Sequence, residues 1–394
     1  MSGGEAGPGR LPHEAYLGAM SALERVGPST MRRLLGLGPP QEVWGLIRRG
    51  RLPDRFLRSL PGPTAAAAGG WAASSDGLDP AEVWARCERL GVGAVSLGSP
   101  GYPAALLEDP EPPVVLFHLG DPDVLALPRV AVVGTRAATS YGRRVAGELG
   151  HGLATAGVCV VSGLALGIDA AAHRGALSAD PAHAARGAAV VGGGLDAPGP
   201  VRNADVARGL VERGVVLSEV PPGVAAHPWR FPVRNRVLAG LAQAVVVVES
   251  AAAGGSMLTV AQAQLRDRPV LAVPGPVDSR VSAGTNGLIE EGAGLCTGVG
   301  DVLAALGAHA PLPAGGGPPP DPPPRPTGLA ARVLDELGWR PATPEQLAGR
   351  LCMGLVDLAR TVAHLEDHGW AVRRGGWVER VARGPVRRPG GAGP

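Results

Sequence analysis

Three arginines surround one phenylalanine in the segment Arg230–Arg236, which reads Arg-Phe-Pro-Val-Arg-Asn-Arg. Aromatic residues make up only 3% of the chain, so a phenylalanine among guanidinium groups stands out. A base stacked on Phe231, with its phosphates held by the arginines, is typical of proteins that bind single-stranded nucleic acid. A buried phenylalanine beneath a solvated basic face would give the same pattern. The absence of acidic residues between Glu219 and Glu249 concentrates positive charge in this part of the chain.

A second candidate is the turn Gly134-Thr135-Arg136, which follows an apolar run and precedes a helix that we expect to begin near residues 139–140. A helix N-terminus offers free backbone N–H groups, and Arg136 adds a fork-shaped donor, so the turn could bind an anion. An ordinary strand–helix turn with a solvated arginine is equally consistent with these residues. The dinucleotide fingerprint GxGxxG is absent here.

The segment Ser162–His173 combines two glycines with an acid and a base. Gly163 and Gly167 would let the backbone approach a ligand without interference from a Cβ atom. Asp169 and His173, four residues apart, would share one helical face and could form an acid–base pair. We favour the alternative that both residues orient the loop by hydrogen bonds, because no nucleophile accompanies them.

Glycines and hydroxyls also open the helix expected after the fifth apolar run. A cradle for an anion at this helix N-terminus is predicted. It would be formed by Gly254, Gly255, Ser256 and Thr259. No Asp or Glu occurs from residue 250 to residue 266, which argues against a hydrolytic acid on this helix.

The elements that must position these segments are six short apolar runs whose starts lie 26 to 30 residues apart. That spacing fits one strand plus one crossover helix. The runs do not alternate polar and apolar residues, so we expect a parallel sheet that is covered on both faces. The fold class is therefore α/β. The runs are Val130–Val133, Val158–Val161, Ala188–Val191, Val215–Leu217, Ala244–Val248 and Val270–Val273.

The composition excludes several kinds of chemistry. All 37 basic residues are arginine, which excludes a lysine-dependent P-loop and Schiff-base catalysis. The net charge of +2 means that any nucleic-acid site must be a local patch. The nine histidines and four cysteines show no metal-ligand spacing, so no metal or other cofactor is expected. Without an apolar signal core or a membrane-length apolar stretch, we expect a cytoplasmic protein with free thiols that does not associate with membranes.

Changes in composition divide the chain into expected domains. Residues 1–70 predict a helical unit of the SAM or helix–hairpin–helix kind, and residues 61–80 look like a linker because they are rich in Ala, Gly, Pro and Ser. The strand–helix units occupy 81–307. A Pro/Gly-rich tether is expected over 308–328.

A small C-terminal domain is expected at 329–380, followed by a disordered basic tail at 381–394. Thr343 to Gln346 form a capping box with proline at the first helical position. Two further helical stripes and a hairpin signal at Gly375-Gly376 complete the pattern of a winged helix.

Taken together, these segments resemble the DNA-processing protein A family (DprA, also called Smf). The resemblance covers roughly 95–300. It rests on Gly101-Tyr102-Pro103, Gly134-Thr135-Arg136, Ser162–His173, Gly194-Leu195-Asp196, Ser218-Glu219, Phe231–Arg236, Gly254–Thr259 and Gly284-Thr285-Asn286, in this order.

The resemblance implies an extended Rossmann-like domain that binds single-stranded DNA without catalysis and forms a homodimer. It also implies protection of incoming DNA during natural transformation, and assistance in loading the RecA recombinase. The DNA-binding residues would be Arg136, Ser162, Gly163, Gly167, Phe231, Arg234, Asn235, Arg236, Gly254, Gly255, Ser256 and Thr259.

Two alternative hypotheses differ from that of a non-catalytic protein that binds single-stranded DNA. The Gly254–Thr259 loop is also comparable to that of the lysine-decarboxylase-like phosphoribohydrolases, which process nucleotides, but Gln262 stands where their acid is expected. The winged helix could instead make the chain a regulator that binds duplex DNA. Arg373, Arg374 and the basic tail are the residues that favour this last reading.

Overall fold

The computed structural model describes residues 11–182, 186–307, 326–338, 340–368, 370–374 and 376–381. The described residues form two compact units, one made of residues 11–138, 142–182 and 186–307 and the other beginning at residue 326. The expected tether at 308–328 lies outside the described residues up to residue 325, and Gly328 already begins a helix. The expected basic tail lies outside them from residue 382 onward.

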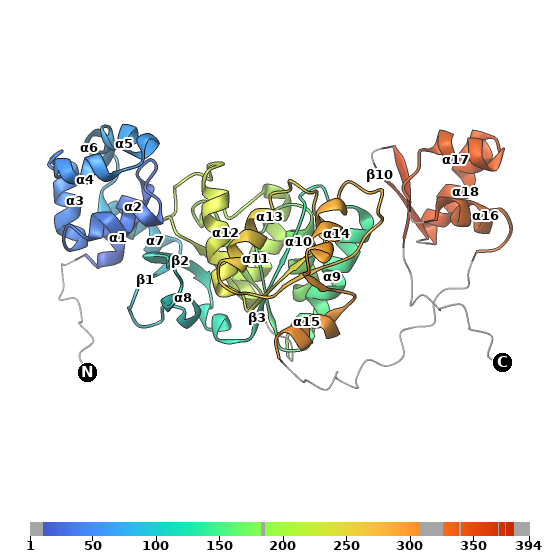
Figure 1. The fold of residues 1–394 in the computed structure, drawn as a ribbon, viewed down its shortest axis with the longest axis horizontal. Coiled ribbons are helices and arrows are strands. Elements are labelled where there is room, and N and C mark those ends of the chain that lie inside the picture. Colours follow the sequence, from blue (N-terminus) through green and yellow to red (C-terminus); the bar gives the residue numbers. More distant parts are fainter. Residues whose placement is uncertain are drawn as a thin grey trace. The chain divides into compact units, whose positions relative to one another are not determined.

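Small helices build the N-terminal part of the first unit (Figure 1). They are α1 (His13–Ala22), α2 (Pro28–Leu35), α3 (Pro40–Arg48), α4 (Asp54–Ser59), α5 (Gly62–Ala68), α6 (Trp71–Ser75) and α7 (Pro80–Arg89). The linker expected at 61–80 is therefore wrong, because α5 and α6 occupy most of it. Trp71 explains the difference: its indole is 1% exposed and its N–H donates to the Glu24 carbonyl at 2.9 Å, which anchors this Ala-rich stretch to the core.

A nine-stranded sheet forms the centre of the first unit. Across the sheet the strands are β1 (Gly93–Ser96), β2 (Val115–Gly120), β6 (Val215–Ser218), β5 (Ala188–Val191), β4 (Cys159–Ser162), β3 (Arg129–Val133), β7 (Ala244–Val247), β8 (Val270–Ala272) and β9 (Gly294–Leu295). The pairs from β6 to β9 are parallel, whereas β1 and β2 are antiparallel. The predicted extended Rossmann-like sheet is thus confirmed, with the antiparallel strands β1 and β2 added at one edge and the short parallel strand β9 at the other.

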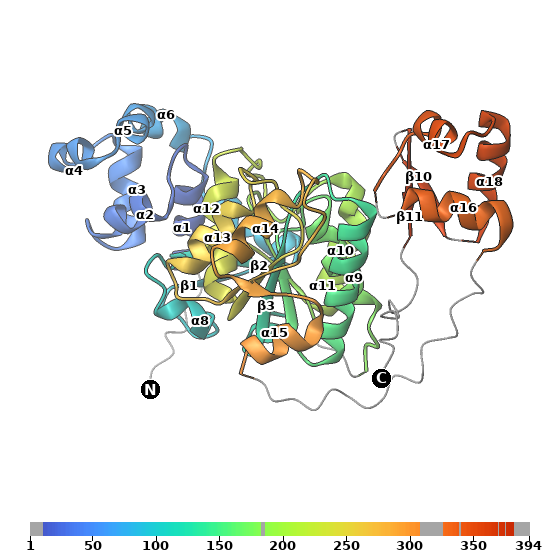
Figure 2. The same ribbon diagram turned by 45° about the vertical axis from the view of Figure 1, so that its right-hand side comes forward.

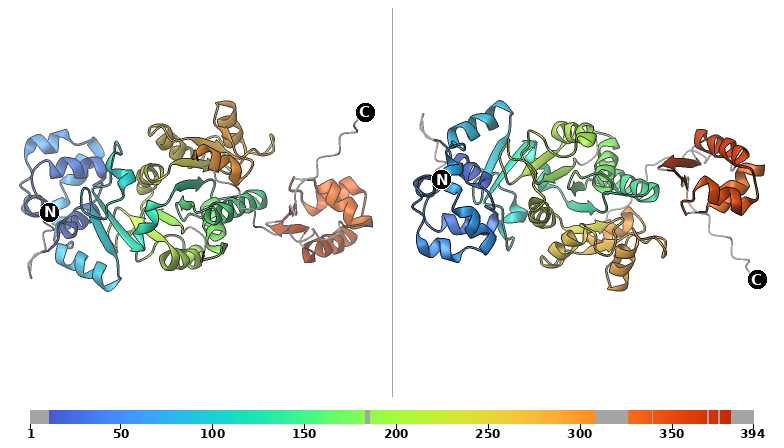
Figure 3. Two further views of the ribbon diagram at one scale, coloured as in Figure 1. Left: turned by 90° about the horizontal axis from the view of Figure 1, so that it is seen from below. Right: turned by 90° about the horizontal axis from the view of Figure 1, so that it is seen from above.

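Helices cover both faces of this sheet (Figures 2 and 3). On one side lie α9 (Ser140–Thr155), α10 (Ile168–Ser178) and α11 (Ala204–Arg213), and on the other lie α12 (Arg230–Leu241), α13 (Met257–Gln264) and α14 (Ala283–Glu290). The remaining elements are α8 (Ala104–Leu107), α15 (Val299–Ala305) and the 3-10 turns Pro122–Ala126 and Val201–Asn203. Alternate residues of one strand enter different cores: Ala188 and Val190 pack with α12, whereas Ala189 and Val191 join the N-terminal helices.

The strand order places a switch point beside β3. The chain runs from β3 through β4 and β5 to β6, then returns to the other side of β3 as β7. Crossovers diverge at such a point, so a crevice opens at the carboxyl ends of the two strands. Segments that follow β3 and β7 are therefore the first place to look for a ligand site.

The second unit is a winged helix. Its elements are α16 (Gly328–Leu337), α17 (Pro344–Leu351), α18 (Leu355–Asp367), β10 (Ala371–Arg374) and β11 (Trp377–Arg380). The expected capping box is present, because Thr343 accepts from the Gln346 N–H while the Gln346 side chain accepts from the Thr343 N–H. Within the described residues, no helix is long and apolar enough to cross a membrane. The same residues contain no cluster of His, Cys, Asp and Glu suited to a metal ion.

Candidate nucleic-acid interface

The Arg136 guanidinium lies over the Phe231 ring, with its Cζ atom 5.0 Å from the ring centroid. Arg136 belongs to the turn after β3 and is exposed, whereas Phe231 lies in the first turn of α12 and is half-buried. The other phenylalanines, Phe56 and Phe117, are buried in the core. The structure therefore brings together two residues 95 positions apart and leaves this one phenylalanine ring partly accessible.

Arg234, three residues after Phe231 on α12, is close enough to Arg136 for the two charges to interact. Its side chain is buried, and its Nη2 donates to the Gly163 carbonyl at 3.3 Å. Burial lowers the pKa of Arg234, while the nearby Asp169 carboxylate opposes that shift and the Arg136 charge adds to it. A Cβ atom at Gly163 would lie 1.9 Å from Arg234 Nη1, so glycine is required for this packing.

Asp169 organises the loop that follows β4. Its Oδ2 accepts from the N–H groups of Gly163 at 3.1 Å and Ala165 at 3.4 Å. Burial raises the pKa of Asp169, and the Arg234 charge and the two backbone donors oppose the shift. At the start of the loop, the Ser162 hydroxyl donates to the Val132 carbonyl at 2.6 Å. Asp169 thus orients the loop by hydrogen bonds, as expected.

His173 behaves differently from that expectation. Its ring is 0% exposed, and neither ring nitrogen makes a hydrogen bond of good geometry with the described residues. Burial, with a contribution from the Arg234 charge, lowers the pKa of His173 to about 3, and the Ser162 backbone opposes this only in part. The imidazole is therefore a neutral, buried group.

Two glycines let the turn after β3 pack closely on its neighbours. Gly167 has φ +85°, and a Cβ there would lie 2.3 Å from the Thr135 carbonyl oxygen. At Gly134 a Cβ would lie 2.7 Å from the Glu249 carbonyl oxygen. The Thr135 N–H donates to that same carbonyl at 2.7 Å. Loops from three neighbouring strands thus fix the backbone that carries Arg136.

The loop before α13 follows β7, the other strand of the switch point. Ser256 is buried and its hydroxyl bonds to the Ser250 hydroxyl at 2.8 Å, while Thr259 is buried on the first turn of α13. A Cβ at Gly254 would lie 2.4 Å from Ser250 Oγ, whereas one at Gly255 would meet nothing within 4 Å. Gly255 therefore leaves its backbone open to a ligand.

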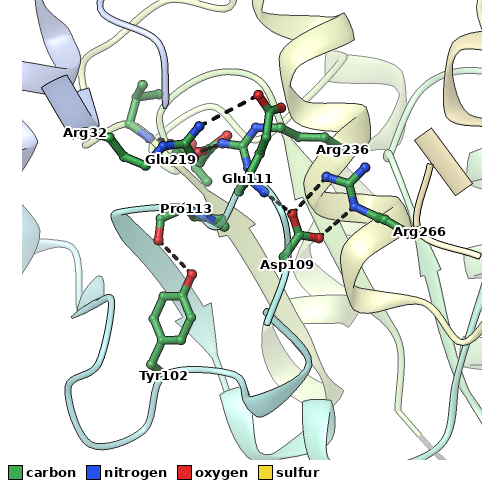
Figure 4. Close-up of polar contacts among 10 residues, drawn as sticks. Arg32, Tyr102, Asp109, Glu111, Pro113, Glu219, Arg236 and Arg266 are labelled. Carbon is green, nitrogen blue, oxygen red and sulfur yellow. Dashed lines mark hydrogen bonds and ion pairs between the residues drawn. The ribbon is translucent and has the colours of Figure 1, made fainter. Parts of the chain in front are cut away.

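Arg236 departs from the expectation that it contacts DNA. Its side chain is only 4% exposed, and it pairs with the Glu219 carboxylate and donates to the Glu111 carbonyl. Figure 4 shows this network, in which Asp109 and Arg266 form a second buried pair with Nε–Oδ2 at 2.7 Å and Nη2–Oδ1 at 2.9 Å. Asn235, between Arg234 and Arg236, is half-buried. The structure thus groups Arg136, Phe231 and Arg234 and separates Arg236 from them.

Sequence reasoning overlooked Trp229, which directly precedes the arginine-rich helix. Its ring is half-buried and lies against the Arg230 guanidinium, with Cζ 4.3 Å from the ring centroid. A second aromatic residue so close to Phe231, in a chain with 3% aromatic residues, was the signal that could have found it.

Comparison with known proteins identifies the family of this chain. A family model described as DNA recombination-mediator protein A matches residues 94–307, and one described as the DprA winged helix domain matches residues 317–376. The chain belongs to the DprA family. This membership gives it a role in DNA processing.

Several DprA proteins show how far the similarity extends. A putative DprA of Mycobacterium tuberculosis is 38% identical over 297 residues, which are 70% of this chain and 73% of the relative. DprA of Streptococcus pneumoniae is 41% identical over 203 residues, 52% of this chain and 70% of the relative. An X-ray structure of S. pneumoniae DprA matches with a TM-score of 0.59 and 31% identity, covering 74% of this chain and 96% of that one.

Proposed function

We propose that this chain binds single-stranded DNA without catalysing a reaction on it. As the family resemblance implies, it would protect incoming DNA in natural transformation and assist RecA loading in recombination, as a homodimer and without a cofactor. The observation that carries the proposal is the contact of Arg136 with Phe231, close to the buried Arg234. A partly accessible ring beside an exposed guanidinium suits a base and its phosphate, and this combination tolerates any sequence.

The location of the pair supports the proposal. It lies beside the switch point of the sheet, where ligands of open α/β sheets bind. The loop before α13, on the adjacent strand, supplies the exposed backbone of Gly255 at a helix N-terminus, which suits a second phosphate. We therefore assign direct contacts to Arg136, Phe231, Asn235 and the Gly254–Ser256 loop.

The buried residues have a positioning role in this proposal. Arg234 and Asp169 hold the Gly163 backbone, and Gly167 holds the turn that carries Arg136. Ser162 joins the end of β4 to β3 through its bond to the Val132 carbonyl, and Thr259 is buried in the first turn of α13. We leave Arg236 out of the contact set because Glu219 neutralises it.

The state of the acid and base near the site favours binding over hydrolysis. The Asp169 carboxylate accepts two backbone N–H groups, and His173 is fully buried and neutral. A general base must come within hydrogen-bond reach of the proton that it removes. The phosphoribohydrolase hypothesis requires an acid at position 262, where this chain has Gln262. The Gln262 Oε1 accepts a hydrogen bond from Arg266 Nη1 at 2.7 Å.

The test is a titration of labelled oligo-dT and of a matched duplex with the purified full-length protein. At about 50 mM salt we expect oligo-dT to bind more tightly than the duplex, and to weaken towards about 200 mM with a log–log slope of about 0.7 per phosphate contact. Arg136→Ala should lower that slope by about 0.7. Arg55→Ala, which removes an exposed arginine of α4, is the control. Equal binding of the duplex, or release of a free base from nucleotides, would overturn the proposal.

A further inference from the structure

A second cluster of arginine and aromatic side chains adjoins the first one. The Trp229 ring lies against two guanidinium groups: Arg230, with Cζ 4.3 Å from the ring centroid, and Arg25, with Cζ 6.0 Å away. Arg25 belongs to the turn between α1 and α2, so this cluster joins the start of α12 to the N-terminal helices.

The two arginines of this cluster have different environments. Arg230 is 8% exposed, and its Nη2 donates to the Ser21 carbonyl of α1 at 3.1 Å. Its burial lowers the pKa of the guanidinium to about 10, and the Glu219 charge opposes the shift. Arg230 therefore ties α12 to α1 and supports the indole from within. Arg25 is exposed, and its guanidinium forms no ion pair with a carboxylate of the described residues.

The backbone at Arg25 is in a costly conformation. Its φ of +59° lies in the left-handed region, which a glycine or asparagine would occupy with less strain. Such outliers persist where the surrounding structure over-determines them, and they cluster at functional sites. Here the strained residue is the one that carries its charge out to the face of an accessible ring.

Trp229 also differs from the tryptophans of the core. Trp71 and Trp44 are 1% and 4% exposed, and the Trp71 N–H donates to Glu24, the residue before Arg25. Trp229 is half-buried instead. The exposed part of Trp229 is therefore available to a ligand.

Trp229 and Phe231 are two residues apart, and each has an exposed arginine from another element over its ring. Arg136 comes from the turn after β3, and Arg25 comes from the N-terminal helices. The repeated combination of ring and cation matches the repeat of base and phosphate along an unpaired strand. We propose that Trp229 and Arg25 form a second stacking position, so that a bound DNA strand continues from Phe231 onto the N-terminal helices. This inference rests on the proposed function.

The test compares oligo-dT binding by the wild-type chain with binding by Trp229→Ala, Trp229→Phe and Arg25→Gln, using an oligonucleotide of about twenty nucleotides to exceed a site of ~4–16. We expect Trp229→Ala to weaken binding by about 5- to 150-fold, because one stacked base is lost. Trp229→Phe should retain most of the affinity. Arg25→Gln should lower the salt slope by about 0.7, and the matched control Arg55→Gln should leave it unchanged.

A second readout separates a DNA contact from a packing role. Oligonucleotides carrying 5-iododeoxyuridine, when irradiated with the wild-type protein, should form adducts on the peptide that contains Trp229 and Phe231. The adduct should move to one ring in each single alanine variant. Thermal melting of Arg25→Gln should match the wild type, because the side chain is exposed.

The outcomes are distinct. If Arg136→Ala weakens binding while Trp229→Ala and Arg25→Gln bind as the wild type does, the second position is overturned and the proposed function survives. If Arg55→Gln lowers the salt slope as much as Arg25→Gln, the change in slope comes from the net charge of the protein and not from a contact at Arg25. The second position is then also overturned. If the wild-type chain ignores oligo-dT, the proposed function itself fails.

Discussion

Single side chains at this site are divided between a buried layer and an exposed one. Arg234, Asp169 and His173 are each less than a tenth exposed, whereas Arg136 is open to solvent and Phe231 is half-buried. Burying ionisable groups costs stability unless partners compensate for the lost hydration. The Gly163 backbone supplies such partners, because its carbonyl accepts from Arg234 and its N–H donates to Asp169. These two buried side chains therefore hold the loop after β4 in one conformation.

His173 predicts a dependence of stability on pH. The pKa of His173 is about 3 in the folded state and 6.5 in the unfolded state. Between these two pH values the unfolded chain binds a proton that the folded chain does not bind. The stability from the neutral ring is complete above pH 6.5 and is lost as the pH falls towards 3. Between about pH 7.5 and about pH 5 the loss is about 2 kcal/mol.

Urea unfolding of the wild type and of His173→Leu at these two pH values measures this loss. The variant should lack about 2 kcal/mol of the wild-type pH dependence. Replacement by leucine also removes two buried nitrogens without good hydrogen bonds, so we expect little loss of stability at neutral pH. An identical pH dependence in both proteins would contradict a depressed pKa at His173.

Gly163 predicts an effect on binding that acts through Arg234. In Gly163→Ala the new methyl group would occupy the place of Arg234 Nη1, 1.9 Å away, and the guanidinium must move. We expect oligo-dT affinity to fall roughly tenfold, because the charge close to the Arg136–Phe231 pair is displaced. Gly300→Ala is the control, since a Cβ there meets nothing within 4 Å. Unchanged affinity in Gly163→Ala would separate Arg234 from DNA binding.

At the scale of elements, α12 presents different sides to different tasks. Phe231 and Arg234 join the site, while Arg236 turns to Glu219 and the 102–113 segment. In that segment the Tyr102 hydroxyl donates to the Pro113 carbonyl at 2.7 Å, and Asp109 reaches Arg266 just beyond α13 (Figure 4). These contacts hold α12 and α13 against the antiparallel edge of the sheet, which keeps the first turn of α12 in place.

The Asp109–Arg266 pair gives a prediction about this element. Both side chains are 3–4% exposed, so Asp109→Asn would leave a buried guanidinium without its counter-charge. We expect the free energy of unfolding to fall by about 3–5 kcal/mol. Glu148→Gln, which breaks the exposed pair with Arg144 on α9, should cost less than about 1 kcal/mol. Equal losses from the two substitutions, in denaturant titrations, would refute a structural role specific to Asp109.

The sheet could be predicted from the sequence, and much of the site could not. Val130–Val133 and its counterparts are apolar on both faces because both faces are covered, and each strand begins or ends within a residue or so of the predicted run. Helix α6 was missed because its order depends on a distant contact of Trp71. Arg234 and Arg236 look alike in sequence, and only Gly163 and Glu219, brought close by folding, give them different roles.

At the scale of the whole molecule, the chain consists of two units that each have a hydrophobic core of their own. The core of the winged helix contains Val333, Leu347, Leu358 and Val362, and none of its residues comes from the first unit. The proposed DNA contacts all lie in the first unit. Strand binding and whatever the winged helix contributes are therefore separable by truncation.

A chain ending at Gly307 tests this separation. We expect it to fold, and to bind oligo-dT within about threefold of the full-length chain, because the lost arginines contribute few of the phosphate contacts. Circular dichroism and anisotropy titrations measure both properties. If the truncated chain folds but does not bind oligo-dT, the binding site lies in the second unit, and the hypothesis of a duplex-binding regulator is favoured.

The Arg136–Phe231 contact joins segments that belong to opposite sides of the sheet. Arg136 leads into α9 and Phe231 opens α12, and the sheet lies between these two helices (Figure 2). A DNA strand bound to both residues would connect the helical layers on the two faces of the sheet. Amide exchange with deuterated water would then slow in both layers at once when the strand binds, although only one end of each layer is touched.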